Sequence, residues 1–185
     1  MDNGKISVRY ARALLSASLE QHCETEVYEN LVRLTNNYSL AINQFNEALS
    51  NPMIADSDKM QLLHAAIGEP VHPCLQQFLE FLTEKKRTNK ILLIALKYQE
   101  MYRKHKGIIL AKVTTAAAMD NATLEKIRDY LKGTFHLDVE MHVTVNPALI
   151  GGFTLDIEHD RMDASIAGQL EKLKNSFNSL NSPFK

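Results

Sequence analysis

The side chains best suited to chemistry gather in one stretch, LIGGFTLDIEHDRMDASI, which runs from Leu149 to Ile166. Its potential metal ligands are four carboxylates and one histidine: Asp156, Glu158, His159, Asp160 and Asp163. A metal ion needs such ligands to converge on one point. A metal-dependent hydrolase that uses Asp156, Glu158, His159 and Asp160 is therefore one hypothesis. It requires a further ligand from another segment, and the sequence offers no obvious one.

The same stretch also has the pattern of a β-hairpin. Apolar and polar residues alternate over 153–158, FTLDIE, so a strand would place its carboxylates on one face and its apolar side chains on the other. The segment EHDR suits the turn, and either Asp163 or Ser165 suits the start of a following helix. The glycines Gly151 and Gly152 suit a bend before the first strand. We favour this hairpin with a solvent-exposed polar face, and expect neither a metal nor a cofactor.

No other motif indicates an active site. The remaining histidines are scattered without HExxH spacing, and no serine lies in a GxSxG context. The glycine pair lacks the spacing of a phosphate-binding loop. No active site is therefore recognisable from these motifs.

Composition narrows the class of protein further. Hydrophobic residues make up 45% of the 185 residues, which is typical of a globular chain. The net charge of −1 gives no electrostatic reason to bind nucleic acid or an anionic membrane. No apolar run approaches the ~20 residues of a membrane span, and the N-terminus lacks a secretory signal. Cys23 and Cys74 are predicted to be reduced thiols, with a single disulfide as the alternative.

The periodicity of the chain changes at its middle, which predicts an α+β protein. Up to Lys106 the pattern is helical throughout, with five or six helices, and we expect an all-α six-helix bundle over residues 1–106. The pattern of residues 107–185 predicts a small α/β domain. It begins with a strand in 107–119, a helix in 120–135 capped by Asp120 or Asn121, and a half-exposed strand over 138–145. The hairpin and a closing helix over 164–177 follow.

The first helix has two apolar stripes where one would be enough to pack it on a core. The first stripe comprises Ile6, Tyr10, Ala13 and Ala17. The second comprises Val8, Ala11, Leu15 and Leu19. Two stripes indicate either burial on two sides or a groove for a partner helix, and the pattern alone favours burial. The helix near residues 73–87 poses the same question, because Phe81 is offset from the face formed by Leu75, Phe78, Leu79 and Leu82.

The segment LIGGFTLDIEHDRMDASIAGQLEKLK resembles the C-terminal signature of the delta subunit of F-type ATP synthases, the oligomycin-sensitivity-conferring protein family. The signature is two small residues, an apolar strand, a turn, and Asp-x-Ser-apolar-x-Gly-x-Leu-x-x-Leu. It falls on Gly151, Gly152, Asp163, Ser165, Ile166, Gly168, Leu170 and Leu173. The opening ISVRYARALLSASLEQ is similar to the family's first helix, and FLEFLTEKKRTNKI to its fifth. The chain departs from the family at Ala167, where arginine is common, and at His159, where the turn is commonly Gly-Asp.

The resemblance implies a non-catalytic stator subunit, which is not an enzyme and has no small-molecule substrate. In this family the helical domain binds the N-terminal segments of alpha subunits on the catalytic head, and the C-terminal domain binds the b subunits of the peripheral stalk. The implied binding residues are Ile6, Tyr10, Ala13, Ala17, Phe78, Phe81 and Leu82. Within this family, the missing targeting peptide favours a bacterial protein on the cytoplasmic face of the plasma membrane, in contact with the membrane only through the complex. A processed organellar chain is the alternative. A helical adaptor of an unrelated complex is the competing hypothesis.

Overall fold

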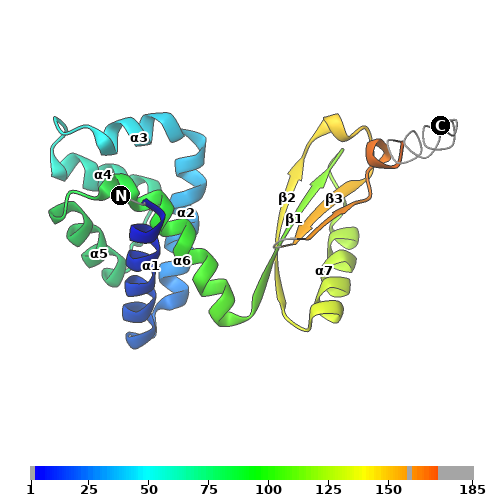
Figure 1. The fold of residues 1–185 in the computed structure, drawn as a ribbon, viewed down its shortest axis with the longest axis horizontal. Helices are drawn as coiled ribbons and strands as arrows, with labels where there is room; N and C mark the ends of the chain where they lie inside the picture. Colours follow the sequence, from blue (N-terminus) through cyan, green and yellow to red (C-terminus); the bar gives the residue numbers. More distant parts are fainter. Residues whose placement is uncertain (1–2, 158–159, 171–185) are drawn as a thin grey trace, which may run out of the picture. The chain divides into compact units, whose positions relative to one another are not determined.

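The computed structural model describes residues 3–157 and 160–170 of the chain. The chain divides into two compact units, Met1–His105 and Lys106–Lys185. Mixed helices and a small sheet confirm the α+β class (Figure 1).

The first unit is built from helices joined by short turns. Its elements are α1 (Asn3–Glu20), α2 (Glu24–Leu40), α3 (Ile42–Ser50), α4 (Asp56–Ile67), α5 (Pro73–Glu84), the 3₁₀ turn η1 (Thr88–Lys90) and α6 (Ile91–Lys106). Proline at the first position of α5 is favourable, because the missing N–H has no helical partner there. The His72 side chain accepts a hydrogen bond from the Cys74 N–H and so caps the same helix.

Buried tyrosines connect the helices of this unit. The Tyr98 hydroxyl on α6 lies 2.9 Å from the Ser18 hydroxyl of α1 and donates to the Glu24 carbonyl at 3.1 Å. Tyr102 stacks on Tyr28 with ring centroids 4.3 Å apart. Because a buried hydroxyl without a partner is costly, these hydrogen bonds allow tyrosine to occupy the core.

The buried face of α1 lies beside the first predicted apolar stripe and shares only Ala11 with the second. Ser7, Ala11, Leu14 and Ser18 are its buried residues, each at most 2% exposed. Their spacing of four, three and four residues is that of one helical face. The residues of the first stripe therefore flank the core instead of forming its centre, which leaves Tyr10 and Ala17 half-buried and Ala13 exposed.

The second unit is a four-stranded sheet packed on one helix. Its elements are β1 (Ile108–Thr115), α7 (Asn121–Phe135), β2 (Asp138–Val145), the 3₁₀ turn η2 (Pro147–Leu149), β3 (Phe153–Ile157) and β4 (Asp160–Asp163). The strand order is β2-β1-β3-β4, with β1 parallel to β2 and antiparallel to β3. The predicted hairpin is confirmed as the antiparallel pair β3–β4, and residues 166–170 begin a helix after it.

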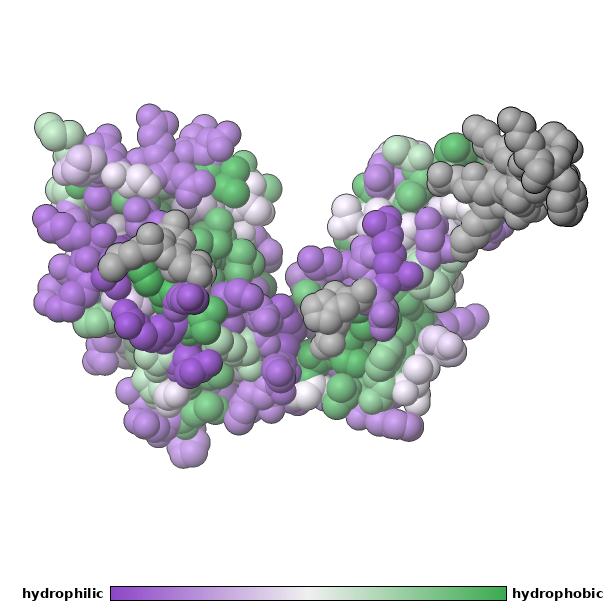
Figure 2. All heavy atoms as spheres, viewed as in Figure 1, coloured by the Kyte–Doolittle hydropathy of each residue, from purple (hydrophilic) through white to green (hydrophobic). Residues whose placement is uncertain are grey.

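The core of this unit lies between the sheet and α7, and Ala111, Val113, Leu131 and Leu155 are its buried members. Asp120 is confirmed as the N-cap of α7, since its carboxylate accepts from the Thr123 N–H at 3.2 Å. The strand predicted over 138–145 is present as β2, but its predicted alternation of buried and exposed residues holds only in part, because Val143 and Val145 are 42% and 50% exposed. Apolar residues form a continuous area on the visible face of this unit, whereas hydrophilic residues cover most of the first unit's visible face (Figure 2).

Candidate functional site: a groove between two helices

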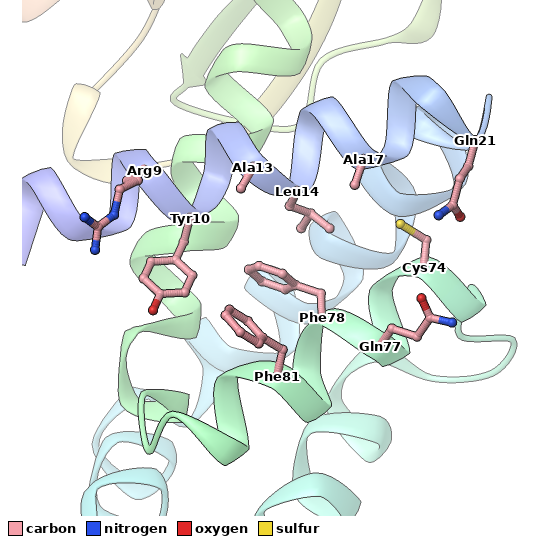
Figure 3. Close-up of a pocket in the computed structure, with 10 residues that line it drawn as sticks. All are labelled: Arg9, Tyr10, Ala13, Leu14, Ala17, Gln21, Cys74, Gln77, Phe78 and Phe81. Carbon is pink, nitrogen blue, oxygen red and sulfur yellow. The ribbon is translucent and has the colours of Figure 1, made fainter.

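An apolar groove of about 520 Å³ lies between α1 and α5 of the first unit (Figure 3). Its lining residues are Arg9, Tyr10, Ala13, Leu14, Ala17, Gln21, Cys74, Gln77, Phe78 and Phe81. On α1 and on α5 they recur at the three- and four-residue spacing of one helical face. Alanines on the α1 side leave room for a further side chain, and phenylalanines form the opposite wall (Figure 3). Such a surface suits an amphipathic helix.

Tyr10 is held in place by groups from α5 and from the turn that follows it. Its ring lies 6.4 Å from the Phe78 ring in an edge-on arrangement and 6.1 Å from the Phe81 ring. The Arg87 guanidinium lies 5.5 Å from the centroid of the Tyr10 ring and donates to its hydroxyl at 2.9 Å. These contacts fix the aromatic wall before any partner binds, which reduces the entropy lost on binding.

The predicted groove residues fall into three groups. Tyr10, Ala13, Ala17, Phe78 and Phe81 line the groove. Ile6 is half-buried on the same helix but is not among the lining residues. Leu82 is fully buried and belongs to the core, so its placement on the binding surface was wrong. Successive side chains on a helix differ in direction by about 100°, so Leu82 points into the core although its neighbour Phe81 points outward.

Sequence reasoning missed the polar residues of the groove, Leu14 and Cys74. Arg9, Gln21 and Gln77 do not stand out in a hydrophobic pattern, although their spacing places them beside the apolar stripe. Leu14 is 2% exposed and forms the floor of the groove as well as part of the core.

Two free cysteine thiols, both buried, meet at one end of the groove. Cys74 lines the groove at the start of α5, and Cys23 lies in the turn after α1. Burial raises the pKa of the Cys23 thiol to about 11, and the adjoining Cys74 thiol and the nearby Glu26 and Glu24 add to the rise. The structure therefore has the free thiols predicted first and not the alternative disulfide.

In the second unit, the two predicted glycines pack against residues 164–166, where the helix that follows β4 begins. A Cβ on Gly151 would lie 2.6 Å from the Ile166 side chain. A Cβ on Gly152, whose φ is +77°, would lie 2.3 Å from the Ala164 carbonyl oxygen. Backbone hydrogen bonds connect the same segments, from Ile166 N–H to the Gly151 carbonyl and from Ala164 N–H to the Phe153 carbonyl. At Gly152 only glycine fits without moving the backbone, whereas a side chain at Gly151 would have to displace the Ile166 side chain.

The Asp-x-Ser-x-x-Gly part of the motif is a single capping structure. The Ser165 hydroxyl accepts from the Gly168 N–H at 3.0 Å, as an N-cap does. The Asp163 carboxylate accepts from the Ser165 N–H at 2.9 Å and occupies the space that a Cβ on Gly168 would need. The spacing of Asp163, Ser165 and Gly168 in the sequence therefore follows from the geometry of this one helix cap.

The described carboxylates of the acidic stretch do not share one face of the sheet. Asp156 lies on the face opposite α7, whereas Asp160 is the register partner of Ile157, which packs on the core beneath α7. The Asp156 carboxylate is 3.5 Å from the Arg161 guanidinium, and Lys112 is its register partner on β1. Thr154, expected on a solvent-exposed face, is 2% exposed, so that face is not uniformly solvated. Glu158 and His159 lie outside the described residues. Among the residues that are described, no three His, Cys, Asp or Glu side chains are placed to hold a metal ion.

None of the described helices combines the length and the apolar character needed to cross a bilayer. Residues 6–177 match the family model described as "ATP synthase delta (OSCP) subunit".

Curated relatives and a solved structure agree with this match. The chain is 35% identical over 181 residues to the ATP synthase subunit delta of Bacteroides fragilis, covering 96% of both chains. It is 36% identical over 174 residues to the corresponding subunit of Parabacteroides distasonis, covering 94% of this chain and 96% of the relative. Its fold matches a chain of the Toxoplasma gondii mitochondrial ATP synthase hexamer with a TM-score of 0.71 and 20% identity, covering 96% and 98% of the two chains. The chain belongs to the ATP synthase delta (OSCP) subunit family, a non-catalytic stator component of the F-type ATP synthase.

Proposed function

We propose that this subunit connects the catalytic head to the peripheral stalk, with residues 1–106 binding alpha-subunit N-terminal segments and residues 107–185 binding b subunits. The observation that supports the head contact is the groove between α1 and α5. It is apolar, walled by aromatic rings and already ordered by Arg87, as a docking site for an amphipathic helix should be.

An exposed apolar surface in the second unit supports the stalk contact. Ile150, Ile166 and Leu170 are 75%, 46% and 57% exposed. Ile150 adjoins Gly151, which contacts Ile166, and Leu170 follows Ile166 by one helical turn. Burying such side chains against a helical partner contributes about 25 cal/mol per Å² of apolar area.

A joint of this kind must resist rotor torque and needs no chemistry of its own. When one chain carries both contacts, the second binding event becomes intramolecular and the two affinities reinforce each other. In this role the subunit sits peripherally on the cytoplasmic face of a bacterial plasma membrane, held by the complex, during proton-driven ATP synthesis.

The bridging role can be tested by native mass spectrometry of the catalytic head and the soluble part of b, mixed with this chain. We expect one assembly that contains all three. Ala13→Lys should fill the groove and lose the head while keeping b, with Ser16→Lys, exposed on the polar side of α1, as its control. Leu170→Lys should lose b while keeping the head, with Gln169→Lys as its control. Loss of the same partner from both variants would overturn the division of roles.

A further inference from the structure

The two ends of the groove carry different charge. Tyr10, in the first half of α1, contacts Phe81 near the end of α5, whereas Cys23, just beyond α1, contacts Cys74 at the start of α5. The two helices are therefore antiparallel along the groove. We call the ends the Tyr10 end and the Cys74 end.

The Tyr10 end is basic. Arg9 lines it, Arg87 lies over the Tyr10 ring, and Lys85 lies 5.5 Å from the centroid of the Phe81 ring. Figure 3 shows Arg9 beside Tyr10, at the opposite end of the groove from Cys74.

The positive charge of this end is only partly compensated. Lys85 pairs with Glu84 at 2.9 Å. Arg87 donates to the Tyr10 hydroxyl, which is neutral, and within the part of the chain that the structure describes neither Arg9 nor Arg87 has a carboxylate partner. Among the described residues, two guanidinium groups thus lie beside an apolar surface without a carboxylate counter-charge.

The Cys74 end is neutral to acidic. Gln21 and Gln77 line it with uncharged amides (Figure 3). Beyond them lies the first turn of α2, whose Glu24 and Glu26 are close enough to act on the Cys23 thiol. A carboxylate on a bound helix would be repelled here and attracted at the Tyr10 end.

We infer that the groove selects the orientation of its helix by charge: the bound alpha-subunit helix places an acidic side chain at the Tyr10 end, facing Arg9 and Arg87. This inference rests on the proposed function for the identity of the helix. Apolar burial supplies most of the affinity, and the arginines fix the direction in which the helix lies.

The affinity test uses the full chain and a peptide that covers the alpha-subunit N-terminal segment of the same organism. Arg9→Glu reverses a charge at the Tyr10 end, and the matched control Arg12→Glu makes the same change at an exposed α1 position that does not line the groove. We expect Arg9→Glu to weaken binding about fivefold at low salt and less at high salt, and Arg12→Glu to change it less than about twofold. Equal effects of the two variants would overturn the inference.

The orientation test attaches a nitroxide to the peptide, either next to its acidic residue or at its other end. With the label at the acidic end, we expect stronger broadening of the Tyr10 amide resonance than of the Gln77 resonance, and the reverse with the label at the other end. The opposite pattern, or equal broadening, would contradict the inferred orientation. If the wild-type chain binds no peptide at all, the proposed function fails instead.

Discussion

Replacing Gly152 with alanine should destabilise the second unit severely. The backbone of Gly152 has φ +77°, where an L-residue is disfavoured by about 1–2 kcal/mol. The new Cβ would also lie 2.3 Å from the Ala164 carbonyl oxygen and 2.9 Å from Ser165 Cα. Both are backbone atoms, so the clash can be relieved only by separating β3 from the start of the helix that follows β4, which costs about 1–3 kcal/mol more. The sum is about 2–5 kcal/mol.

Gly133→Ala is the matched control, because the same substitution at Gly133 meets no atom within 4 Å inside α7. Alanine there should stabilise the unit by about 1 kcal/mol through helix propensity. Amide hydrogen exchange of β1 and β3 reports on this unit separately. A loss of about 3 kcal/mol corresponds to roughly a hundredfold faster exchange through global opening in Gly152→Ala. If Gly152→Ala and Gly133→Ala shift exchange in the same direction, the packing role assigned to Gly152 is refuted.

Two further predictions concern local stability and pH. Ser165→Ala should remove the cap on the Gly168 N–H and cost about 1 kcal/mol, seen as faster exchange of the Gly168 amide while β1 is unchanged; equal protection in the variant would argue against the cap. The raised pKa of Cys23 means that the folded state holds this proton more tightly than the unfolded state does. The contribution of Cys23 to stability is thus present below pH 9 and lost as the pH rises to about 11. Between pH 9 and 11 the melting temperature of the wild type should therefore fall more than that of Cys23→Ala. The variant should still show some fall, because burial also raises the pKa of Tyr98. If the melting temperatures of the wild type and Cys23→Ala fall in parallel as the pH rises, the contribution assigned to Cys23 is wrong.

Periodicity was sufficient to predict most of the elements. The strand at 138–145, the helix capped by Asp120 and the hairpin after Gly152 all follow from local patterns that tertiary contacts did not override. The groove residues on α1 came from the family resemblance, because the two apolar stripes by themselves favoured burial on two sides.

What the pattern could not show depends on contacts between distant segments. Ser7 and Ser18 are polar by type, yet they form the buried face of α1, where the Ser18 hydroxyl meets Tyr98. Leu82 looks like its apolar neighbours in the sequence, and only the packing of α5 shows that it is in the core. Thr154 has the alternation of an exposed position but is buried. The charge difference along the groove arises because α1 and α5 run antiparallel, which no single helix reveals.

The most direct test of the central claim is calorimetric titration of the full chain with the alpha-subunit N-terminal peptide, comparing Phe81→Ser with Leu93→Ser. Both side chains are apolar and 43% exposed, but only Phe81 lines the groove. A phenylalanine side chain has about 200 Å² of apolar surface that a partner can bury. Burying the exposed part of Phe81 at about 25 cal/mol per Å² contributes about 2 kcal/mol, or roughly thirtyfold in affinity. The account predicts one-to-one binding that Phe81→Ser weakens by about this factor and Leu93→Ser leaves within about twofold. Equal affinities of the two folded variants, or no binding by the wild type, would contradict it.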